Sequence, residues 1–272
     1  MPAVQLTQLQ SQINQLSWLY TRPPEYIAGL RVLFEQYANL VFKKGQITRK
    51  LRHYPTYNIP PVLLNQLELS LIGNHKRYPQ ASLPLVDALW QEKYYEPKYL
   101  ASALLGRIDP GEAAPVLERV IKWCQPDLHP VVSDAILDRA TLTLRYQYAP
   151  VWISQLETWL NPLNQSLHTV GLRAMLPLIK DRQFDNLPPV FRLLSPFIEN
   201  PRADHQPLLA DLLIALFHRT PIETTYLLRQ MSQRGLSPTA QRLIRRVLPV
   251  FPPSEQEQLR LLLKDSSPTD PQ

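Results

Sequence analysis

Cysteine and glycine are both scarce in this sequence. The 272 residues include a single cysteine, Cys124, which excludes an intramolecular disulfide and a zinc site built from two or more cysteines. Only 7 glycines stand against 28 prolines, which favours stiff connectors over flexible linkers and over glycine-rich turns that cradle phosphate groups. Because a lone cysteine is typical of a reducing compartment, we expect a cytoplasmic protein.

Long apolar runs and a signal peptide are also missing. Residues 4–19 intersperse Gln with Leu, Ile and Val in the manner of an amphipathic helix, without a basic start before an apolar run. The apolar run at 208–217 includes Asp211 and is much shorter than the roughly 20 residues of a spanning helix. We expect no membrane segment.

The sequence lacks the fingerprints of several enzyme classes. Its 6 histidines are scattered, without a pair four residues apart or a nearby carboxylate cluster of metal-ligand spacing, so no metal site is predicted. It contains no nucleophile elbow, Walker motif or dinucleotide-binding motif, and no cofactor is expected. Cys124, at the end of an apolar helix, is expected to be a small buried side chain.

Helical periodicity is what the sequence does contain. From residue 83 onward, apolar residues recur every three or four positions in blocks bounded by Pro, Asn, Asp or Gly. No segment alternates apolar and polar residues like a strand beside a hairpin turn, so the predicted fold class is all-α. The predicted helices are 83–90, 97–106, 112–123, 131–147, 150–160, 167–180, 188–199, 206–218, 223–234 and 239–249.

Taken in pairs, these helices repeat at roughly 30 to 40 residues, near the period of HEAT and armadillo arrays. Such pairs bury their apolar stripes only by stacking, which predicts a HEAT-like, armadillo-type superhelix, or solenoid, with a concave binding surface. We expect an N-terminal helical cap with a basic linker over residues 1–58, with helices at 6–19 and 26–42. The repeat domain would cover 59–264, and a disordered tail 265–272.

Basic residues gather near the two ends of the predicted stack. The formal net charge is +6, which suits an anionic partner. The tract 42–57 interleaves cations with aromatic residues and holds no acid, which favours phosphate binding over the alternative of a solvated loop. The predicted nucleic-acid-binding residues are Lys43, Lys44, Arg49, Lys50, Arg52, Arg242, Arg245 and Arg246.

Two stretches resemble a known family. Residues 89–106, LWQEKYYEPKYLASALLG, resemble the signature of the bacterial DNA alkylation repair (AlkD-like) family, in which a Trp-bearing helix, a connector and a Glu precede an Ala-rich helix. Residues 210–251 are similar to the family's C-terminal pattern of helix, Pro, helix, Leu-Ser and basic helix. The resemblance implies a helical-repeat protein that holds duplex DNA in a basic concave groove. It also implies excision of a cationic alkylated base by two Trp, an Asp and an Arg.

The first Trp and the Asp of that family have two possible counterparts here. In the family the Trp stands four residues before the Asp, and Trp123 with Asp127 keeps this spacing, although Pro126 lies between them. Asp134, in VVSDAIL, keeps the position at the start of a helix but has Pro130 where the Trp is expected. Both alignments remain open.

The family's Arg and second Trp are matched less completely. Arg173 fits the family's Trp-x-x-Arg-Ala pattern except that Val170 replaces the Trp. The second Trp should fall near Leu212 or Leu213, and neither is aromatic. The resemblance therefore implies a site without its aromatic residues, and we expect no efficient excision. The candidate catalytic residues are Asp134, Arg173, Trp123 and Asp127.

Each candidate also has a structural interpretation. Trp123 would close a helix in the core, and Asp134 would complement a helix dipole. Asp127 would be a loop or cap residue, and Arg173 would bind phosphate or cap a neighbouring helix. The aromatic group Trp90, Tyr94, Tyr95 and Tyr99 is expected to pack between repeats rather than stack on bases.

Three functions are consistent with these patterns. The first is binding of duplex or branched DNA without efficient glycosylase activity. The second is a scaffold whose concave surface holds a protein partner. The third is an alkylpurine DNA glycosylase, a hydrolase, with a rearranged pocket. Cations gathered on one concave surface would favour the first function over the second, whereas the third needs aromatic residues beside Asp134 or Asp127.

Overall fold

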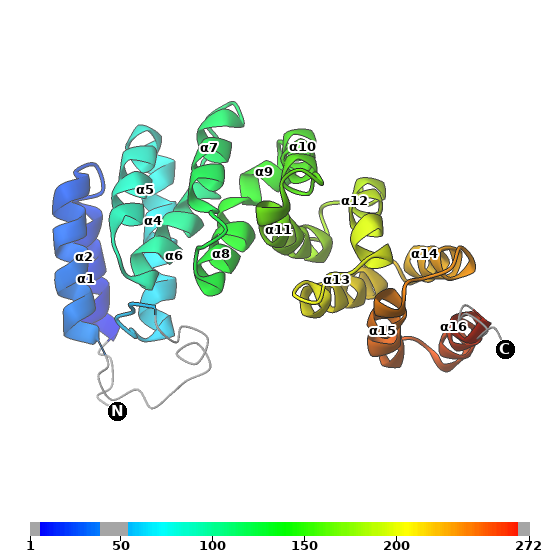
Figure 1. The fold of residues 1–272 in the computed structure, drawn as a ribbon. Helices are drawn as coiled ribbons and strands as arrows, with labels where there is room; N and C mark the ends of the chain where they lie inside the picture. Colours follow the sequence, from blue (N-terminus) through cyan, green and yellow to red (C-terminus); the bar gives the residue numbers. More distant parts are fainter. Residues whose placement is uncertain (1–5, 39–53, 266–272) are drawn as a thin grey trace. The chain divides into compact units, whose positions relative to one another are not determined.

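Helices are the regular elements of this chain. The computed structural model describes residues 6–38 and 54–265, and no strand occurs within these ranges. The predicted all-α fold class is therefore confirmed. By their contacts the residues divide into two compact units, Met1–Trp152 and Ile153–Gln272 (Figure 1). The boundaries predicted at residues 58 and 264 stay predictions.

In the first unit, α4 occupies a central place. It packs between α1 and α6, while α2 contacts α1 and α5, and α6 also contacts α5 and α8 (Figure 1). The helices are α1 (Leu6–Ser17), α2 (Pro23–Tyr37), α4 (Pro61–Arg77), α5 (Ser82–Gln91), α6 (Tyr95–Leu105), α7 (Ala114–Trp123), α8 (Pro130–Ala135) and α9 (Leu142–Tyr146).

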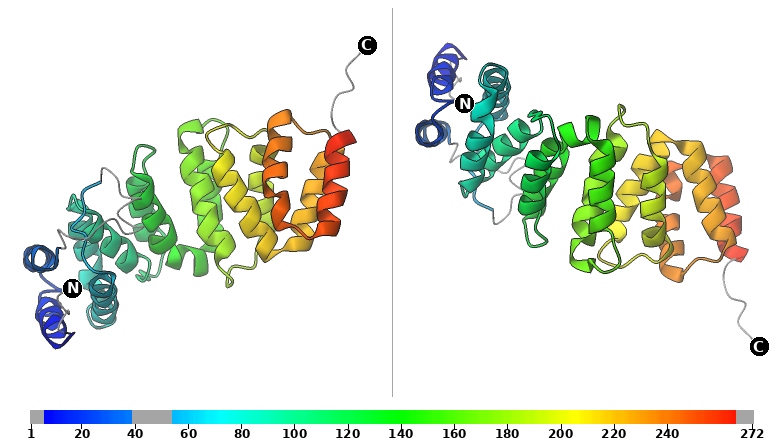
Figure 2. Two further views of the ribbon diagram at one scale, coloured as in Figure 1. Left: turned by 90° about the horizontal axis from the view of Figure 1, so that it is seen from below. Right: turned by 90° about the horizontal axis from the view of Figure 1, so that it is seen from above.

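In the second unit, α13 packs against α11, α14 and α15, and α16 packs against α14. Figure 2 shows these helices lying beside one another when viewed from below and from above. They are α11 (His168–Lys180), α12 (Pro188–Glu199), α13 (Gln206–Arg219), α14 (Pro221–Gln233), α15 (Pro238–Val247) and α16 (Pro253–Asp265). They follow α10 (Ala149–Trp159), which begins in the first unit and ends in the second.

Proline accounts for many of the helix starts. The helices α2, α4, α8, α12, α14, α15 and α16 all begin at a proline. The first residue of a helix needs no amide hydrogen, and the fixed φ of proline already suits the helix, so proline starts a helix at little cost. The abundance of proline and the all-helical fold are therefore compatible.

The core is built from leucine stripes. On α4, Leu63, Leu67 and Leu71 recur every four residues and are at most 1% exposed. On α13, Leu212 and Leu213 are completely buried. Burying one such side chain contributes roughly 1.5–3 kcal/mol, so packing of these stripes, rather than helix propensity, holds the helices in place.

The single helix expected at 131–147 is interrupted in the structure. α8 ends at Ala135, a π-helical turn covers Ile136–Ala140, and α9 begins at Leu142. The interruption lies where the chain meets α6: a Cβ added to Gly106 would stand 1.8 Å from the carbonyl oxygen of Arg139. The Thr143 hydroxyl also donates to the Gly106 carbonyl at 2.8 Å. The close approach of two backbones fixes this turn.

Other differences concern helices near the ends of the chain. α4 and α16 were not among the predicted helices. The predicted helix 26–42 is represented by α2, which ends at Tyr37, and residues 39–42 lie outside the described ranges. The basic tract from Lys43 to Arg52 and the tail from residue 266 also lie outside them.

Candidate functional site

The Glu of the family-like signature, Glu96, anchors the chain before α4. It is 3% exposed, and its carboxylate accepts hydrogen bonds from the Thr56 hydroxyl at 2.5 Å and from the amides of Tyr57 and Asn58 at 3.0 and 2.8 Å. The amide of Tyr95 donates to the carbonyl of Pro55 at 2.9 Å. A buried carboxylate with several donors is well satisfied, so this Glu fixes the start of α6.

Asp134 lies exposed on α8. The helix starts at Pro130, and the preceding residue caps it, because His129 Nδ1 accepts a hydrogen bond from the Val131 amide at 3.3 Å. Burial raises the pKa of Tyr95 to about 12. The negative charges of Glu96 and Asp134 also raise this pKa, whereas the Arg139 guanidinium lowers it. Asp134 and Tyr95 are therefore within electrostatic reach of each other, although they come from different helices.

A second tyrosine joins this neighbourhood one helical turn after Tyr95. The ring centroids of Tyr95 and Tyr99 lie 6.0 Å apart, and the Tyr99 hydroxyl donates to Glu68 of α4 at 3.0 Å. The guanidinium of Arg139 lies 4.7 Å from the centre of the Tyr99 ring and pairs with Glu68 at 2.6 Å. The guanidinium thus has both a carboxylate and an aromatic partner.

We call Asp134, Tyr95, Tyr99, Arg139 and Glu68 the tyrosine–carboxylate cluster. Chemically it offers aromatic faces and a carboxylate beside a cation, which are groups that can stabilise positive charge and contact phosphate. From their sequence pattern the tyrosines were expected to pack between repeats, and neither Glu68 nor Arg139 was a predicted site residue. The four-residue spacing of the tyrosines, which places them on one face of a helix, was the available signal.

Trp123 is engaged with another tryptophan. It is 3% exposed, and its ring stacks on Trp90 at 4.1 Å with an angle of 11° between the planes. Lys98 Nζ lies 4.3 Å from the Trp90 ring and donates to the Trp90 carbonyl at 2.6 Å. Both tryptophans line a hollow of about 630 Å³ beside α7. Asp127 is exposed in the connector between α7 and α8.

The second unit carries Arg173, which is partly exposed on α11. Two positions earlier, Gly171 lets α11 approach the end of α10, since a Cβ there would stand 2.7 Å from Leu160 Cδ2. Leu212 and Leu213, near which the family's second Trp was expected, are completely buried and present no surface to a ligand.

Three arginines form an exposed face on α15. Arg242, Arg245 and Arg246 are all exposed, whereas Leu243 and Ile244 between them are buried. Within the described ranges, none of the three lies in an ion pair with a carboxylate. We call these residues the α15 arginine face. Its guanidinium groups are exposed and are therefore available to an anion.

The other predicted nucleic-acid-binding residues lie outside the described ranges and stay predictions. They are Lys43, Lys44, Arg49, Lys50 and Arg52. In the part of the chain that the structure describes, no three His, Cys, Asp or Glu side chains are grouped to hold a metal ion. No described helix combines the length and apolar character needed to cross a bilayer.

The described residues thus define an all-α protein with an arginine face that forms no ion pairs and a cluster of tyrosines with carboxylates. Residues 56–203, more than half of the chain, match the family described as DNA alkylation repair enzyme. The chain belongs to this family, which confirms the resemblance and supports a function related to DNA repair. The match includes the tyrosine–carboxylate cluster and Arg173, whereas the α15 arginine face lies beyond it. No curated protein and no solved structure matches the chain.

Proposed function

We propose that this chain binds duplex DNA through phosphate contacts and does not excise alkylated bases efficiently. The observation that carries the proposal is the α15 arginine face, three exposed guanidinium groups without a carboxylate partner in the described ranges. Arginine forks match the geometry of phosphate oxygens, and uncompensated cations release counterions when they meet DNA. Because the chain belongs to a DNA alkylation repair family, we take DNA to be the anion that these arginines bind.

The architecture that we propose for this function is the HEAT-like solenoid. Support comes from the contacts within each unit, where α5 packs on α6, α13 on α14, and successive pairs on one another. Helical pairs stacked in this manner create extended surfaces suited to a long polymer. Localised cations on such a surface would hold the duplex without reading its sequence.

The proposed lack of efficient excision rests on buried leucines. A cationic base needs aromatic faces around it, and each cation–π contact contributes about 0.5–2 kcal/mol. Leu212 and Leu213 are aliphatic and completely buried, and Trp123 is 3% exposed. The positions at which the family resemblance implied tryptophans therefore offer little aromatic surface to a base.

One observation favours the glycosylase alternative. Tyr95 lies within electrostatic reach of Asp134, so a carboxylate and aromatic residues do occur together. In that case Asp134 would stabilise positive charge on the sugar and orient water, and Arg173 would hold a phosphate. Asp127 would serve as a loop residue, and Trp123 would support Trp90 through the ring stack.

The test is a titration of a labelled DNA duplex at several salt concentrations, measured by fluorescence anisotropy. We expect affinity to fall steeply with salt, and the Arg242→Gln/Arg245→Gln variant to reduce the slope by about 0.9 for each phosphate that it no longer neutralises. The control variant Arg202→Gln/Arg260→Gln removes the same charge from other exposed positions of the second unit and should retain the slope. Undetectable binding at low salt would favour the protein scaffold instead.

A further inference from the structure

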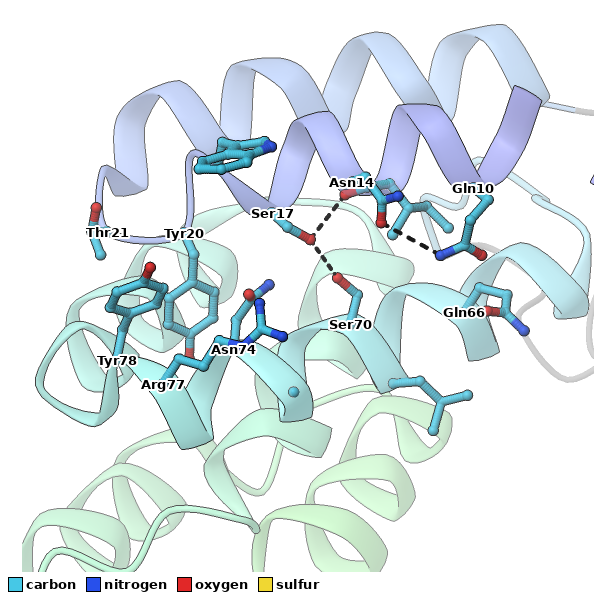
Figure 3. A pocket seen from close by; sticks show the side chains of 14 residues that line it. Gln10, Asn14, Ser17, Tyr20, Thr21, Gln66, Ser70, Asn74, Arg77 and Tyr78 are labelled. Atoms are coloured by element: carbon cyan, nitrogen blue, oxygen red, sulfur yellow. Dashed lines mark hydrogen bonds between the residues drawn. The ribbon is translucent and has the colours of Figure 1, made fainter. Parts of the chain in front are cut away.

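A groove between α1 and α4 of the first unit has no part in the function proposed above. Figure 3 shows it from close by, with one wall from each helix. Its volume is about 640 Å³, which lies within the usual range of ligand pockets. None of the residues that line it belongs to the tyrosine–carboxylate cluster or to the α15 arginine face. We call it the α1–α4 groove.

Both walls of the groove carry uncharged polar side chains at helical spacing. On α1, Gln10 and Asn14 stand four residues apart, and on α4, Gln66 and Asn74 stand eight residues apart, so each pair lies on one face of its helix. The space beside α4 is open at Gly73, where an added Cβ would meet nothing within 4 Å. The walls thus offer donors and acceptors of hydrogen bonds in two rows.

One of these amides is not engaged by neighbouring side chains. Asn74 is 6% exposed, yet its side chain makes no hydrogen bond to any described residue. A side-chain amide carries two donors and an acceptor, which here can bind water or a ligand. Asn74 lines the groove together with Ser70 and Arg77, which are labelled in Figure 3. It is placed to contact whatever occupies this space.

Aromatic rings and a cation mark one end of the groove. Trp18 is 81% exposed and Tyr78 is 45% exposed. Large aromatic side chains contribute most to stability or binding when another group buries them. Arg77 is also exposed and has no ion pair with a described carboxylate. No acidic residue lines the groove. The groove therefore suits a ligand that combines flat rings, polar ring edges and negative charge.

We propose that the α1–α4 groove binds unpaired nucleotides of a single-stranded nucleic acid. Trp18 and Tyr78 stack on bases, because every base has a face on which an aromatic ring can stack. The amides of Asn74 and Gln66 bind the exposed edges of a base, as Asn and Gln side chains do when they form paired hydrogen bonds. Arg77 contacts the phosphate backbone.

A peptide or a neutral oligosaccharide would also use amides and tryptophan, but neither needs a cation. The uncompensated Arg77, the acid-free lining and the net charge of +6 favour a polyanion. The assignment rests on the proposed function only in taking nucleic acid as the partner. It requires neither duplex binding nor the α15 arginine face.

The test uses the full chain and a short fluorescein-labelled oligothymidylate, because thymidylate does not pair with itself. We expect Trp18→Ala to weaken binding by about 5-fold to about 150-fold, the effect of losing one stacked base. Arg77→Gln should reduce the salt dependence, and Asn74→Ala should weaken binding with little change in that dependence. Binding should also change the emission of Trp18, whose ring is exposed in the free protein.

Two control variants match these substitutions. Tyr226→Ala removes an aromatic ring that is 64% exposed on α14, and Arg22→Gln removes an exposed cation outside the groove. Both should bind oligothymidylate like the unsubstituted chain. Undetectable oligothymidylate binding, or binding that Trp18→Ala and Arg77→Gln leave unchanged, would overturn the assignment.

The fates of the two proposals can be distinguished. Duplex binding without oligothymidylate binding would overturn the groove assignment and leave the proposed function standing. Oligothymidylate binding without duplex binding would overturn the proposed function and leave the groove assignment standing. A neutral oligosaccharide that changes Trp18 emission equally in the unsubstituted chain and in Arg77→Gln, with no competition from oligothymidylate, would assign the groove to sugars instead.

Discussion

Single side chains decide whether this chain, proposed above to bind DNA, can also excise a base. Asp134 is exposed and lies within reach of Tyr95, whereas the leucines of α13 are buried where an aromatic residue was expected. A carboxylate alone stabilises positive charge but does not enclose a base. The rate at which the chain releases a free base measures what these residues contribute.

Release of a free base from duplex containing a methylated purine should be slow. The absence of two cation–π interactions removes about 1–4 kcal/mol of transition-state stabilisation, or about one to three orders of magnitude in rate. Residual release should disappear in Asp134→Asn and persist in Asp127→Asn, because Asp134 is the carboxylate near Tyr95. Rapid release that vanishes in Asp134→Asn would show that the cluster replaces the missing aromatics.

The buried side chain of His205 predicts a loss of stability of the second unit in acid. Burial lowers the pKa of His205, which Arg202 and His168 also lower and Asp204 opposes. The ring centroids of His168 and His205 lie 6.3 Å apart, and Nδ1 of each is buried without a hydrogen-bond partner. The folded state therefore binds fewer protons than the unfolded state, so stability present above about pH 6.5 declines as pH falls toward the lowered pKa of His205.

Urea unfolding followed at neutral pH and near pH 5 measures this loss. We expect His205→Asn to reduce the difference between the two midpoints, since the group that must be protonated is gone. The exposed His218 provides the matched control, and His218→Asn should retain the full difference. Equal pH dependence in both variants would contradict the prediction.

Some residue environments could be predicted from sequence, and others could not. Cys124 was expected to be buried and is 1% exposed, because a lone cysteine in an apolar helix packs as a small hydrophobic side chain. The tyrosine–carboxylate cluster could not be predicted from the sequence. It joins side chains from α4, α6, α8 and the π-helical turn, and sequence spacing along one helix says nothing about contacts between distant segments.

At the scale of elements, proline and leucine patterns were sufficient for many helices. The helix predicted at 188–199 has the same limits as α12, since proline begins it and an apolar stripe continues through it. The interruption of 131–147 could not be predicted, because its cause lies on α6. A local sequence pattern carries no information about the distant segment against which a helix will pack.

Two glycines allow the contact at the π-helical turn to be tested. In Gly106→Ala the new methyl group would stand 1.8 Å from the Arg139 carbonyl oxygen, a distance that forces the backbone to move. We expect a loss of about 1–3 kcal/mol or more in the free energy of unfolding. In the matched variant Gly73→Ala, where nothing lies within 4 Å, alanine should instead stabilise the helix by about 0.5–1 kcal/mol.

Chemical denaturation of both variants supplies the measurement. If Gly106→Ala were as stable as Gly73→Ala, the two backbones could not approach as closely as the structure has them. Loss of the turn should also displace Arg139 and hence weaken its interactions with Glu68 and Tyr99.

At the scale of the whole molecule, charge is the property that the sequence determines most directly. The net charge of +6 is a sum over residues and needs no knowledge of packing. We predict that Lys50→Glu/Arg52→Glu weakens duplex binding equally for unrelated DNA sequences, because phosphate contacts carry no sequence information. Binding of several duplexes to this variant and to Arg22→Glu/Arg260→Glu, which has the same net charge, measures the effect. A loss confined to one DNA sequence would indicate base contacts instead.

The single cysteine of the chain, Cys124, allows the opening of the structure around it to be timed. Because Cys124 is 1% exposed and burial raises its pKa, a thiol-reactive dye in excess can modify it only after the surrounding structure opens. The labelling rate at rising denaturant would separate local opening near α7 from global unfolding, without introducing any reporter by mutation. If bound DNA slows that labelling, the labelling rate of Cys124 in the first unit also reports how much of the protein has DNA bound.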